Sequence, residues 1–236
     1  MSTIAIVGAG PGLGRSIARR FGAEGFRVAL VSRNQNKLNL LVDDLATDGI
    51  QAHGFAADVT DRATLTGALS AAKDRFGPID VLEYSPAPLD PQTAGLDPQT
   101  AGLAPVDAAN LTVESVQPQI EYYLYGAITA VRQVLPDMLA RREGAILVST
   151  GASSGPVIHP PFANIAAASG ALRNWVLNLH SALAPQGVYA AHIAIAAWIG
   201  QGGPKSQPDA IAETYWDLYN NRSEPERFYL DEEMNI

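Results

Sequence analysis

Side chains that can move protons occur at three places along this chain. The stretch "STGASSG" places Ser153 and Ser154 directly after an apolar run, where a serine can orient a substrate oxygen or simply cap a turn. The stretch "QIEYYLYG" contains Tyr123, whose phenol can donate a proton if a neighbour tunes its pKa. Tyrosines on helices are more often half-buried packing residues. His159, in "PVIHPPF", is a loop histidine and the third candidate.

Two further ionisable residues, Glu83 and Tyr84, end an apolar run in "VLEYSPA". Ligands bind at the carboxyl ends of strands in parallel sheets, so both residues lie on the side of the sheet where chemistry is expected. The sequence does not show which way either side chain faces.

A glycine-rich stretch near the N-terminus predicts a phosphate site. In "IAIVGAGPGLGRSIARRF" the glycines lie between a strand-like run and a helix-like run. Glycine permits a tight turn and a close approach of the backbone to a pyrophosphate, while a helix N-terminus offers free N–H groups and a positive dipole end. The order strand, glycines, helix predicts a dinucleotide-binding turn. The residues of this turn expected to contact the nucleotide are Gly8, Pro11, Gly12, Leu13 and Gly14.

The end of the second strand-like run, "VALVSRN", indicates which nucleotide binds. A carboxylate at this position would bind a ribose 2′-hydroxyl and repel a 2′-phosphate. Ser32 and Arg33 stand there instead, and the forked guanidinium of arginine suits a phosphate. The sequence therefore favours NADP(H) over NAD(H), with a solvated surface arginine as the alternative reading of Arg33.

Short apolar runs alternate with segments of helical pattern along the whole chain. This rhythm, with continuously apolar strands, predicts a parallel sheet covered by helices on both faces. Right-handed crossovers then favour an α/β, doubly wound, Rossmann-type fold, and we expect a single domain over residues 1–236. The expected strands are Thr3–Gly8, Arg27–Ser32, Gln51–Ala57, Ile79–Tyr84, Ala145–Thr150 and Val188–Ile195. The expected helices are Gly12–Glu24, Gln35–Asp48, Arg62–Phe76, Val113–Arg142 and Phe162–Ala184.

One stretch interrupts this rhythm. The heptapeptide "LDPQTAG" at Leu89–Gly95 is repeated without change at Leu96–Gly102. Surface loops tolerate insertions, so a slipped duplication in an exposed loop is the simpler interpretation. A functional flap over the site is the alternative.

The composition narrows the possible partners. A formal net charge of −8 argues against nucleic acid or an anionic membrane as a partner. The chain has no cysteine, and its four histidines show no metal-binding spacing, so we expect neither disulfides nor a metal site. No apolar run reaches membrane-spanning length, and the first strand begins too early for a signal peptide. We expect a soluble cytoplasmic protein.

The spacing Gly8-xxx-Gly12-Leu13-Gly14 resembles the short-chain dehydrogenase/reductase family, and the similarity extends over nearly the whole chain. Later segments, including "PDAIAETYWDLY", resemble a bacterial glucose-dehydrogenase-like subgroup. The resemblance implies an NADP(H)-dependent oxidoreductase that assembles as a homodimer or homotetramer. It also implies cofactor contacts by Asp58 and Val59 with the adenine, by Ser85 in the place of the family's Asn-Asn-Ala-Gly stretch, and by Ile199 with the nicotinamide carboxamide.

The catalytic set of that family is not matched in this chain. Family members typically use Asn, Ser, Tyr and Lys, and the tyrosine exchanges the proton while the lysine lowers its pKa. The tyrosine position is Ile165 and the lysine position is Ser169. The asparagine position is Tyr123, and the serine position is Ala152, beside Ser153.

Three functions follow. The first is an atypical oxidoreductase acting on a small carbonyl or alcohol, with Ser153 orienting the substrate and Tyr123 or water supplying the proton. The second is an NADP(H)-binding sensor or partner protein without turnover. The third is a lyase or isomerase without net hydride transfer. An intact phosphate site supports all three equally, because site chemistry rather than fold decides function.

Overall fold

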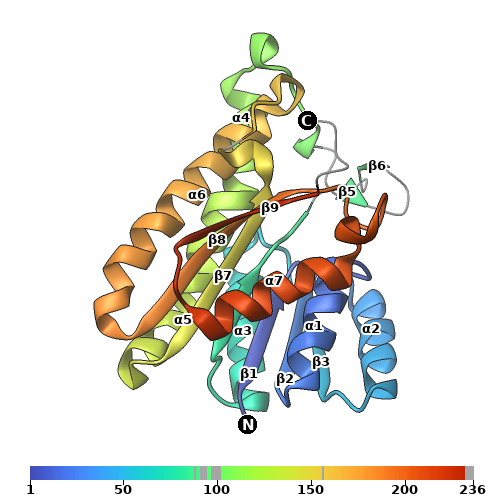
Figure 1. The fold of residues 1–236 in the computed structure, drawn as a ribbon, viewed down its shortest axis with the longest axis vertical. Helices are drawn as coiled ribbons and strands as arrows, with labels where there is room; N and C mark the ends of the chain where they lie inside the picture. The colour runs from blue at the N-terminus through green and yellow to red at the C-terminus, as the bar shows by residue number, and fades with distance from the viewer. Residues whose placement is uncertain (88, 91–94, 97–101, 156, 232–236) are drawn as a thin grey trace.

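One parallel sheet forms the centre of the protein. The computed structural model describes residues 1–87, 89–90, 95–96, 102–155 and 157–231. Seven strands pair in the order β3-β2-β1-β4-β7-β8-β9, and every pairing in this sheet is parallel (Figure 1). The expected α/β fold is therefore confirmed. The strands are β1 (Thr3–Val7), β2 (Arg27–Ser32), β3 (Ala52–Ala56), β4 (Val81–Tyr84), β7 (Gly144–Gly151), β8 (Val188–Ala196) and β9 (Glu226–Leu230).

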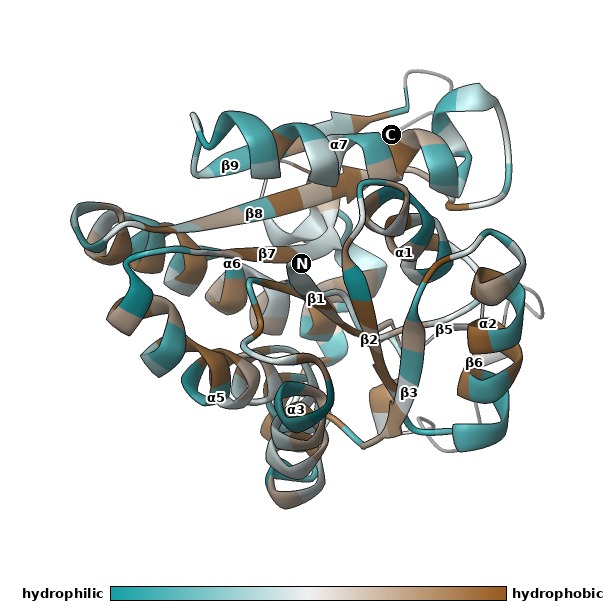
Figure 2. Ribbon diagram, turned by 90° about the horizontal axis from the view of Figure 1, so that it is seen from below, coloured by the Kyte–Doolittle hydropathy of each residue, from teal (hydrophilic) through white to brown (hydrophobic). Residues whose placement is uncertain are grey.

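Helices cover both faces of the sheet (Figure 2). One core lies between the sheet and helices α1 (Leu13–Ala23), α2 (Gln35–Thr47) and α7 (Pro208–Asn221). We call it the α1/α7 core. The other lies between the sheet and α3 (Arg62–Phe76), α5 (Gly126–Arg141) and α6 (Ala163–Leu183), and we call it the α5/α6 core. No helix in the described part of the chain is both long enough and apolar enough to cross a membrane.

The central strands are mostly apolar because both faces of the sheet are covered. In β1, Ile4 and Ile6 enter the α1/α7 core, whereas Ala5 and Val7 enter the α5/α6 core. All nine residues of β8 are buried. Alternate side chains of a strand point to opposite faces, so a strand covered on both sides needs an apolar residue at nearly every position.

The strand order reverses at β1. Strand β2 lies on one side of β1 and β4 on the other, so the chain leaves the carboxyl ends of β1 and β4 toward opposite faces. This divergence opens a crevice at the point where doubly wound sheets bind ligands.

Helix starts differ in how their free N–H groups are satisfied. The side chain of Asn34 accepts a hydrogen bond from the Lys37 amide at the start of α2, and Asp61 accepts from two amides at the start of α3. Such caps satisfy donors that have no partner within the helix. The residue before α1 is Gly12, which has no side chain to cap the helix.

The central helical region is interrupted by π-helical geometry. The expected helix over Val113–Arg142 consists of α4 (Val113–Gln119), a π-helical segment (Ile120–Tyr125) and α5. Within this region the buried hydroxyl of Tyr84 donates a 2.7 Å hydrogen bond to the carbonyl of Tyr122. A side chain at Gly126 would place its Cβ 2.3 Å from that same hydroxyl, so the close approach depends on glycine.

Some elements of the structure were not predicted from the sequence. Strand β9 and helix α7 lie outside the strands and helices predicted above. Within the "LDPQTAG" duplication, the two-residue strands β5 (Leu89–Asp90) and β6 (Gly95–Leu96) pair antiparallel. Most of the remaining duplicated residues lie outside the described residues.

The α1/α7 core contains one buried carboxyl group. Glu83 is fully buried, and its register neighbours are Ile6 and Leu147. Burial raises the pKa of Glu83 to about 8, and a hydrogen bond from Ser85 opposes this in part. The nearby charge of Glu83 also raises the pKa of Tyr215, after burial itself. Glu83 is therefore mostly a neutral carboxylic acid at neutral pH.

We predict that Gly126→Ala destabilises the protein. The added methyl group would meet the Tyr84 hydroxyl at 2.3 Å and the Val59 carbonyl at 2.9 Å, and overpacking of this kind costs about 1–3 kcal/mol. Urea denaturation measures the loss. The control is Gly67→Ala in α3, where no described atom lies within 4 Å of an added Cβ. It should be neutral or stabilising because alanine favours the helix. Equal effects at both positions would contradict the steric argument.

We also predict that the protein loses stability as the pH rises and that Glu83→Gln removes this loss. The folded-state pKa of about 8 lies above the ordinary value of 4.5, so the folded state holds its proton in the interval where the unfolded chain has lost it. The contribution of Glu83 to stability is then greatest below pH 4.5 and falls as the pH rises to about 8, by on the order of 5 kcal/mol in total at ~1.4 kcal/mol per pKa unit. Urea titrations of both proteins at pH 5, 7 and 9 test this. Parallel pH profiles for the two proteins would contradict it.

Candidate functional site

The turn after β1 is built for close contact between backbones. Gly8 has φ +104°, and a Cβ at this position would lie 2.6 Å from the backbone nitrogen of Pro86. The amide of Gly8 donates to the carbonyl of Val31, at 2.9 Å. The turn is thus held between the ends of β2 and β4, directly at the crevice.

The N-terminus of α1 faces this turn without a cap. Gly12 makes no side-chain hydrogen bond, and no acidic residue lies in the first helical turn. A Cβ at Gly12 would meet no described atom within 4 Å, whereas one at Gly14 would lie 3.0 Å from the Cα of Ala9. The space beside Gly12 is therefore open, whereas Gly14 packs tightly against the turn. Free N–H groups and the positive end of the helix dipole suit an anion such as a pyrophosphate there.

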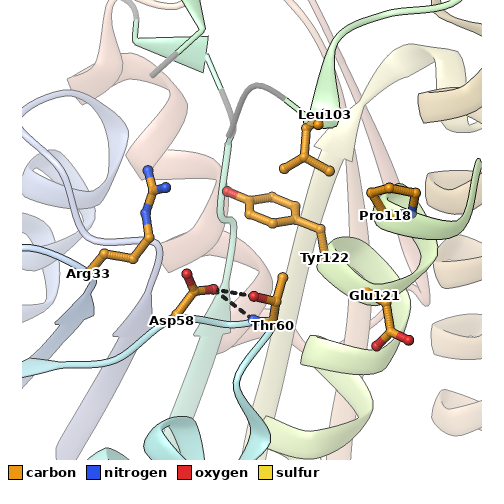
Figure 3. Close-up of a pocket in the computed structure, with 8 residues that line it drawn as sticks. Arg33, Asp58, Thr60, Leu103, Pro118, Glu121 and Tyr122 are labelled. Atoms are coloured by element: carbon orange, nitrogen blue, oxygen red, sulfur yellow. Dashed lines mark hydrogen bonds between the residues drawn. The ribbon is translucent and has the colours of Figure 1, made fainter. Parts of the chain in front are cut away.

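Arg33 and Asp58 meet at a cavity beside the glycine turn. The cavity has a volume of about 290 Å³, and Figure 3 shows these two residues on one side with Tyr122 and Leu103 on the other. A second hollow of about 600 Å³ adjoins it and is also lined by Arg33 and Asp58. The first cavity is lined by Arg33, Asp58, Thr60, Gly102, Leu103, Pro118, Glu121 and Tyr122.

Asp58 is oriented by its own turn. Its Oδ1 accepts hydrogen bonds from the amide of Thr60 at 2.8 Å and from the Thr60 hydroxyl at 2.7 Å (Figure 3). Val59, next to it, is buried in the α5/α6 core. The cavity thus combines a guanidinium, a fixed carboxylate and an aromatic side chain, which together could hold a phosphorylated nucleoside.

The residues after β4 and β8 lie on either side of the crevice. Ser85, half-buried, directly follows β4 and precedes the Pro86 backbone that packs on Gly8. Ile199 follows β8 in a turn, and its side chain packs against the α1/α7 core. Trp198 beside it is 56% exposed.

Glu83 and Tyr84 face opposite sides of the sheet. Glu83 belongs to the α1/α7 side, together with its neighbours Ile6 and Leu147. Tyr84 enters the α5/α6 core, where its hydroxyl is engaged by the Tyr122 carbonyl. Burial raises the pKa of Tyr84 well above its ordinary value.

Tyr123 packs in the π-helical segment. Its side chain is 8% exposed, and its ring meets the edge of the Tyr122 ring with centroids 5.2 Å apart. Burial raises the pKa of Tyr123 far above its ordinary value of 10. A phenol with a raised pKa gives up its proton less readily, so this position suits a hydrogen-bond donor better than a proton donor.

The serine candidates lie on a short 3-10 turn after β7, η4 (Ala152–Ser154). Ser153 is half-buried, and the buried hydroxyl of Ser154 has no hydrogen-bond partner among the described residues. Helix α6 packs against this turn. On that helix Ile165 packs against the α5/α6 core, and the Ser169 hydroxyl donates to the Ile165 carbonyl at 2.7 Å.

The ring contact of His159 is with a residue outside these groups. It is exposed and stacks on Phe162, with ring centroids 4.8 Å apart. The described residues contain no group of three histidine or acidic side chains that could hold a metal ion.

A polar cluster that the sequence analysis missed lies beside η4. The Thr150 hydroxyl contacts His192 Nε2 at 2.9 Å, and His192 Nδ1 contacts Glu226 Oε1 at 3.0 Å. Arg173 of α6 binds both carboxylate oxygens of Glu226, at 2.5 and 2.6 Å. The available signal was His192 itself, a single polar residue within the apolar run "VYAAHIAIA".

Comparisons with known proteins agree with the fold. A putative ketoacyl reductase from Streptomyces coelicolor is 32% identical over 166 residues, which make up 68% of this chain and 58% of that protein. The monensin polyketide synthase putative ketoacyl reductase from Streptomyces virginiae is 32% identical over 192 residues, 79% of this chain and 67% of that protein. The chain thus covers little more than half the length of the first relative.

Solved structures superpose over the whole chain. A short-chain dehydrogenase from Rhodopseudomonas palustris has a TM-score of 0.80 at 25% identity, covering 98% of both chains. An actinorhodin polyketide ketoreductase, solved with NADPH, has a TM-score of 0.80 at 22% identity over 96% of this chain and 95% of that one, which shows the shared fold alone. A family model described as short chain dehydrogenase matches residues 2–198. The chain belongs to the short-chain dehydrogenase family.

Proposed function

We propose that this protein is an NADP(H)-binding oxidoreductase that acts on a small carbonyl or alcohol. The observation that carries the proposal is the uncapped start of α1 beside the Arg33–Asp58 cavity. An anion site and a cavity for a phosphorylated nucleoside adjoin each other, as a dinucleotide requires. Both are formed within what we propose is one domain.

Each part of the cofactor has residues to hold it. The pyrophosphate would be held by the turn residues Gly8, Pro11, Gly12, Leu13 and Gly14. A Cβ at Gly8 or Gly14 would meet neighbouring backbone atoms, so this turn needs glycine at both positions. Ser32 and Arg33 would bind the 2′-phosphate. Asp58 and Val59 would contact the adenine. Ser85 and Ile199 would lie toward the nicotinamide half, which supplies the hydride chemistry when the cofactor is bound.

Relatives and structural neighbours support this assignment. The first relatives are named as reductases, and several neighbours were solved with NADPH or NADP. Another neighbour was solved with NAD. The preference for the phosphorylated cofactor in this chain therefore depends on Ser32 and Arg33, which stand at the end of β2 in place of an acidic residue.

We assign substrate orientation to Ser153 and a hydrogen-bonding role in the cleft to Tyr123. Ser153 is half-buried on η4, where its hydroxyl can contact a substrate oxygen. Ile165 has no proton to give, and the Ser169 hydroxyl is already bound to the Ile165 carbonyl. The usual acid–base pair of the family is thus absent at these two positions.

A second candidate is an NADP(H)-binding protein without turnover. The chemistry of Ile165 and the raised pKa of Tyr123 favour it. Purified protein mixed with NADPH separates the two functions when fluorescence and absorbance are followed with a panel of small ketones and aldehydes. Oxidation of NADPH supports the oxidoreductase. Binding without oxidation across the panel supports the second candidate, and product without an absorbance change indicates a lyase or isomerase.

We further propose that the protein forms a two-fold homodimer or homotetramer. The face of α6 turned away from the sheet carries alanine, glycine and asparagine at helical spacing, which permits close packing of helix on helix. Light scattering in solution reports the mass of the assembly.

Arg33→Asp should weaken NADPH binding far more than NADH binding. The substitution replaces a partner of the 2′-phosphate with a carboxylate that repels it, and we expect a loss of at least about tenfold for NADPH, or ~1.4 kcal/mol. Fluorescence titration of both cofactors measures the effect. Arg132→Asp, at an exposed position on α5, makes the same charge change as a control. Equal losses for both cofactors would refute the assignment of Arg33.

Ile165→Tyr combined with Ser169→Lys should create NADPH-dependent carbonyl reduction or raise an existing activity. A phenol and a neighbouring ammonium would stand on the helix that packs against η4, and general acid catalysis contributes ~10²–10⁴-fold. The matched control is Ile165→Phe with Ser169→Met, which has similar bulk and no proton to exchange. A folded, NADPH-binding double variant with no gain over this control would show that the pocket itself has diverged.

A further inference from the structure

Four polar side chains form a continuous chain on the α5/α6 side of the sheet. The contacts run from Thr150 on β7 to His192 on β8, then to Glu226 on β9 and Arg173 on α6, at 2.9, 3.0 and 2.5–2.6 Å. Thr150 is 6% exposed and His192 fully buried. The Glu226 side chain is 25% exposed, and β9 is an edge strand. The chain therefore connects the buried end of β7 with solvent.

The inner end of this chain adjoins the candidate site. In β7, Ile146 and Val148 enter the α5/α6 core, so Thr150 continues the same face immediately before η4. His192 pairs in register with Val148 and with Glu226. The outer end also touches the turn, because a Cβ at Gly155 would lie 2.9 Å from Arg173 Nε. The chain thus adjoins η4 through Thr150, which precedes it in sequence, and through Arg173, which lies beside Gly155.

The contacts determine where the protons lie. Hydrogen bonds from Arg173 lower the pKa of Glu226, so its carboxylate only accepts, and His192 Nδ1 must carry the hydrogen. Burial lowers the pKa of His192. Glu226 raises it by hydrogen bond and charge, and Arg173 lowers it further. A lowered pKa favours the neutral imidazole at pH 7, in which Nε2 accepts from the Thr150 hydroxyl at 2.9 Å. The carbonyl of Gly151, 3.2 Å from Thr150 Oγ1, is the other acceptor within reach of that hydroxyl.

A hydroxyl, a neutral imidazole and an orienting carboxylate are the parts of a general base. The same order occurs wherever an imidazole removes a proton from a hydroxyl group and a carboxylate stabilises the imidazolium that forms. The contacts here, 2.9 and 3.0 Å, lie within hydrogen-bond reach. Glu83 and Tyr84 offer no comparable group, because one faces the other side of the sheet and the other is bound to a carbonyl.

We propose that Thr150, His192 and Glu226 form the proton-transfer chain of this site and replace the missing tyrosine and lysine. The inference rests on the proposed function. In alcohol oxidation, the substrate hydroxyl proton passes to Thr150 Oγ1 as the threonine proton passes to His192 Nε2. The electron pair of the O–H bond would then form the C=O bond, while the carbinol hydrogen would leave with its own electron pair as hydride to the oxidised nicotinamide of a bound NADP⁺. After the product has left, the imidazolium returns its Nε2 proton through Thr150 Oγ1 to water, which restores the neutral Nδ1–H tautomer beside the ionised Glu226. Reduction runs the same path in reverse.

Three variants test this chain. Thr150→Val keeps the shape and removes the hydroxyl, His192→Gln removes the base, and Thr150→Ser restores a hydroxyl. Thr214→Val, a buried threonine on α7, is the matched control. The assay follows NADP⁺ reduction with a panel of small secondary alcohols. We expect kcat to fall about 10²-fold or more in the first two variants, with recovery to within about tenfold in Thr150→Ser. NADPH affinity and the control should be unchanged.

The pH profile and NMR supply independent readouts. Because the base must be neutral, kcat should be level at neutral pH and fall as the pH drops through the His192 pKa, which lies below the ordinary value of 6.5. ¹⁵N NMR of the wild-type protein without cofactor should show His192 as the neutral Nδ1–H tautomer at pH 7. This measurement remains decisive even if His192→Gln does not fold.

The outcomes separate the two proposals. Undiminished kcat in Thr150→Val and His192→Gln would overturn the proton chain and leave the proposed function intact, with Glu226 as a structural anchor of the edge strand. The Nε2–H tautomer at pH 7 would overturn the chain regardless of activity. A wild-type protein that binds NADPH but turns over no alcohol or carbonyl would overturn the proposed function and the chain with it.

Discussion

The direct backbone contact between the turn after β1 and the loop after β4 is the constraint from which the site follows. At Gly8 no side chain fits, because the backbone of Ser85 and Pro86 occupies the place of a Cβ. The contact holds the two diverging connections together at the point where the strand order reverses. It also leaves the start of α1 facing the crevice with its N–H groups uncapped. The proposed nucleotide site would result from this packing and topology, before any specific side chain is considered.

The two faces of the sheet accommodate buried ionisable groups in different ways. Glu83 lies among apolar neighbours in the α1/α7 core, where it stays protonated because burial disfavours the charge. His192 lies in the opposite core with partners on both ring nitrogens. The first arrangement stabilises a neutral group that exchanges protons only at alkaline pH. The second orients an imidazole between a hydroxyl and a carboxylate, so its proton can move at little cost in reorganisation.

The sequence predicted the elements whose pattern is local and missed those that depend on distant partners. Two predicted segments, Arg27–Ser32 and Arg62–Phe76, have the bounds observed, because their apolar pattern lies within the segments themselves. Strand β9 was missed because only some of its residues are half-buried and it begins with two charged residues, as befits an edge strand. The π-helical break was missed because no local pattern marks it. One of its carbonyls, that of Tyr122, accepts a hydrogen bond from Tyr84, which is 38 residues away in sequence.

The candidate site divides in the same way. The glycine turn and Arg33 are readable because each lies at a recognisable end of a strand. The chain from Thr150 to His192 and Glu226 is not, because strand register alone brings these residues together. Register between parallel strands is set by the whole sheet, and no spacing in the sequence records it.

Helix α6 has no ionisable side chain at Ile165 or Ser169, yet it carries a positive charge near η4 at Arg173. Ser169 lies one turn from Ile165, and its hydroxyl is consumed by the Ile165 carbonyl. One turn further, Arg173 carries the positive charge, but both carboxylate oxygens of Glu226 bind it. That charge cannot tune a phenol, since it is neutralised where it stands. It acts instead on Glu226, which keeps its carboxylate ionised and so holds the hydrogen of His192 on Nδ1. In the proposed proton chain, a cation on this helix would therefore influence proton transfer near η4 through an imidazole in the sheet rather than through a tyrosine on the helix.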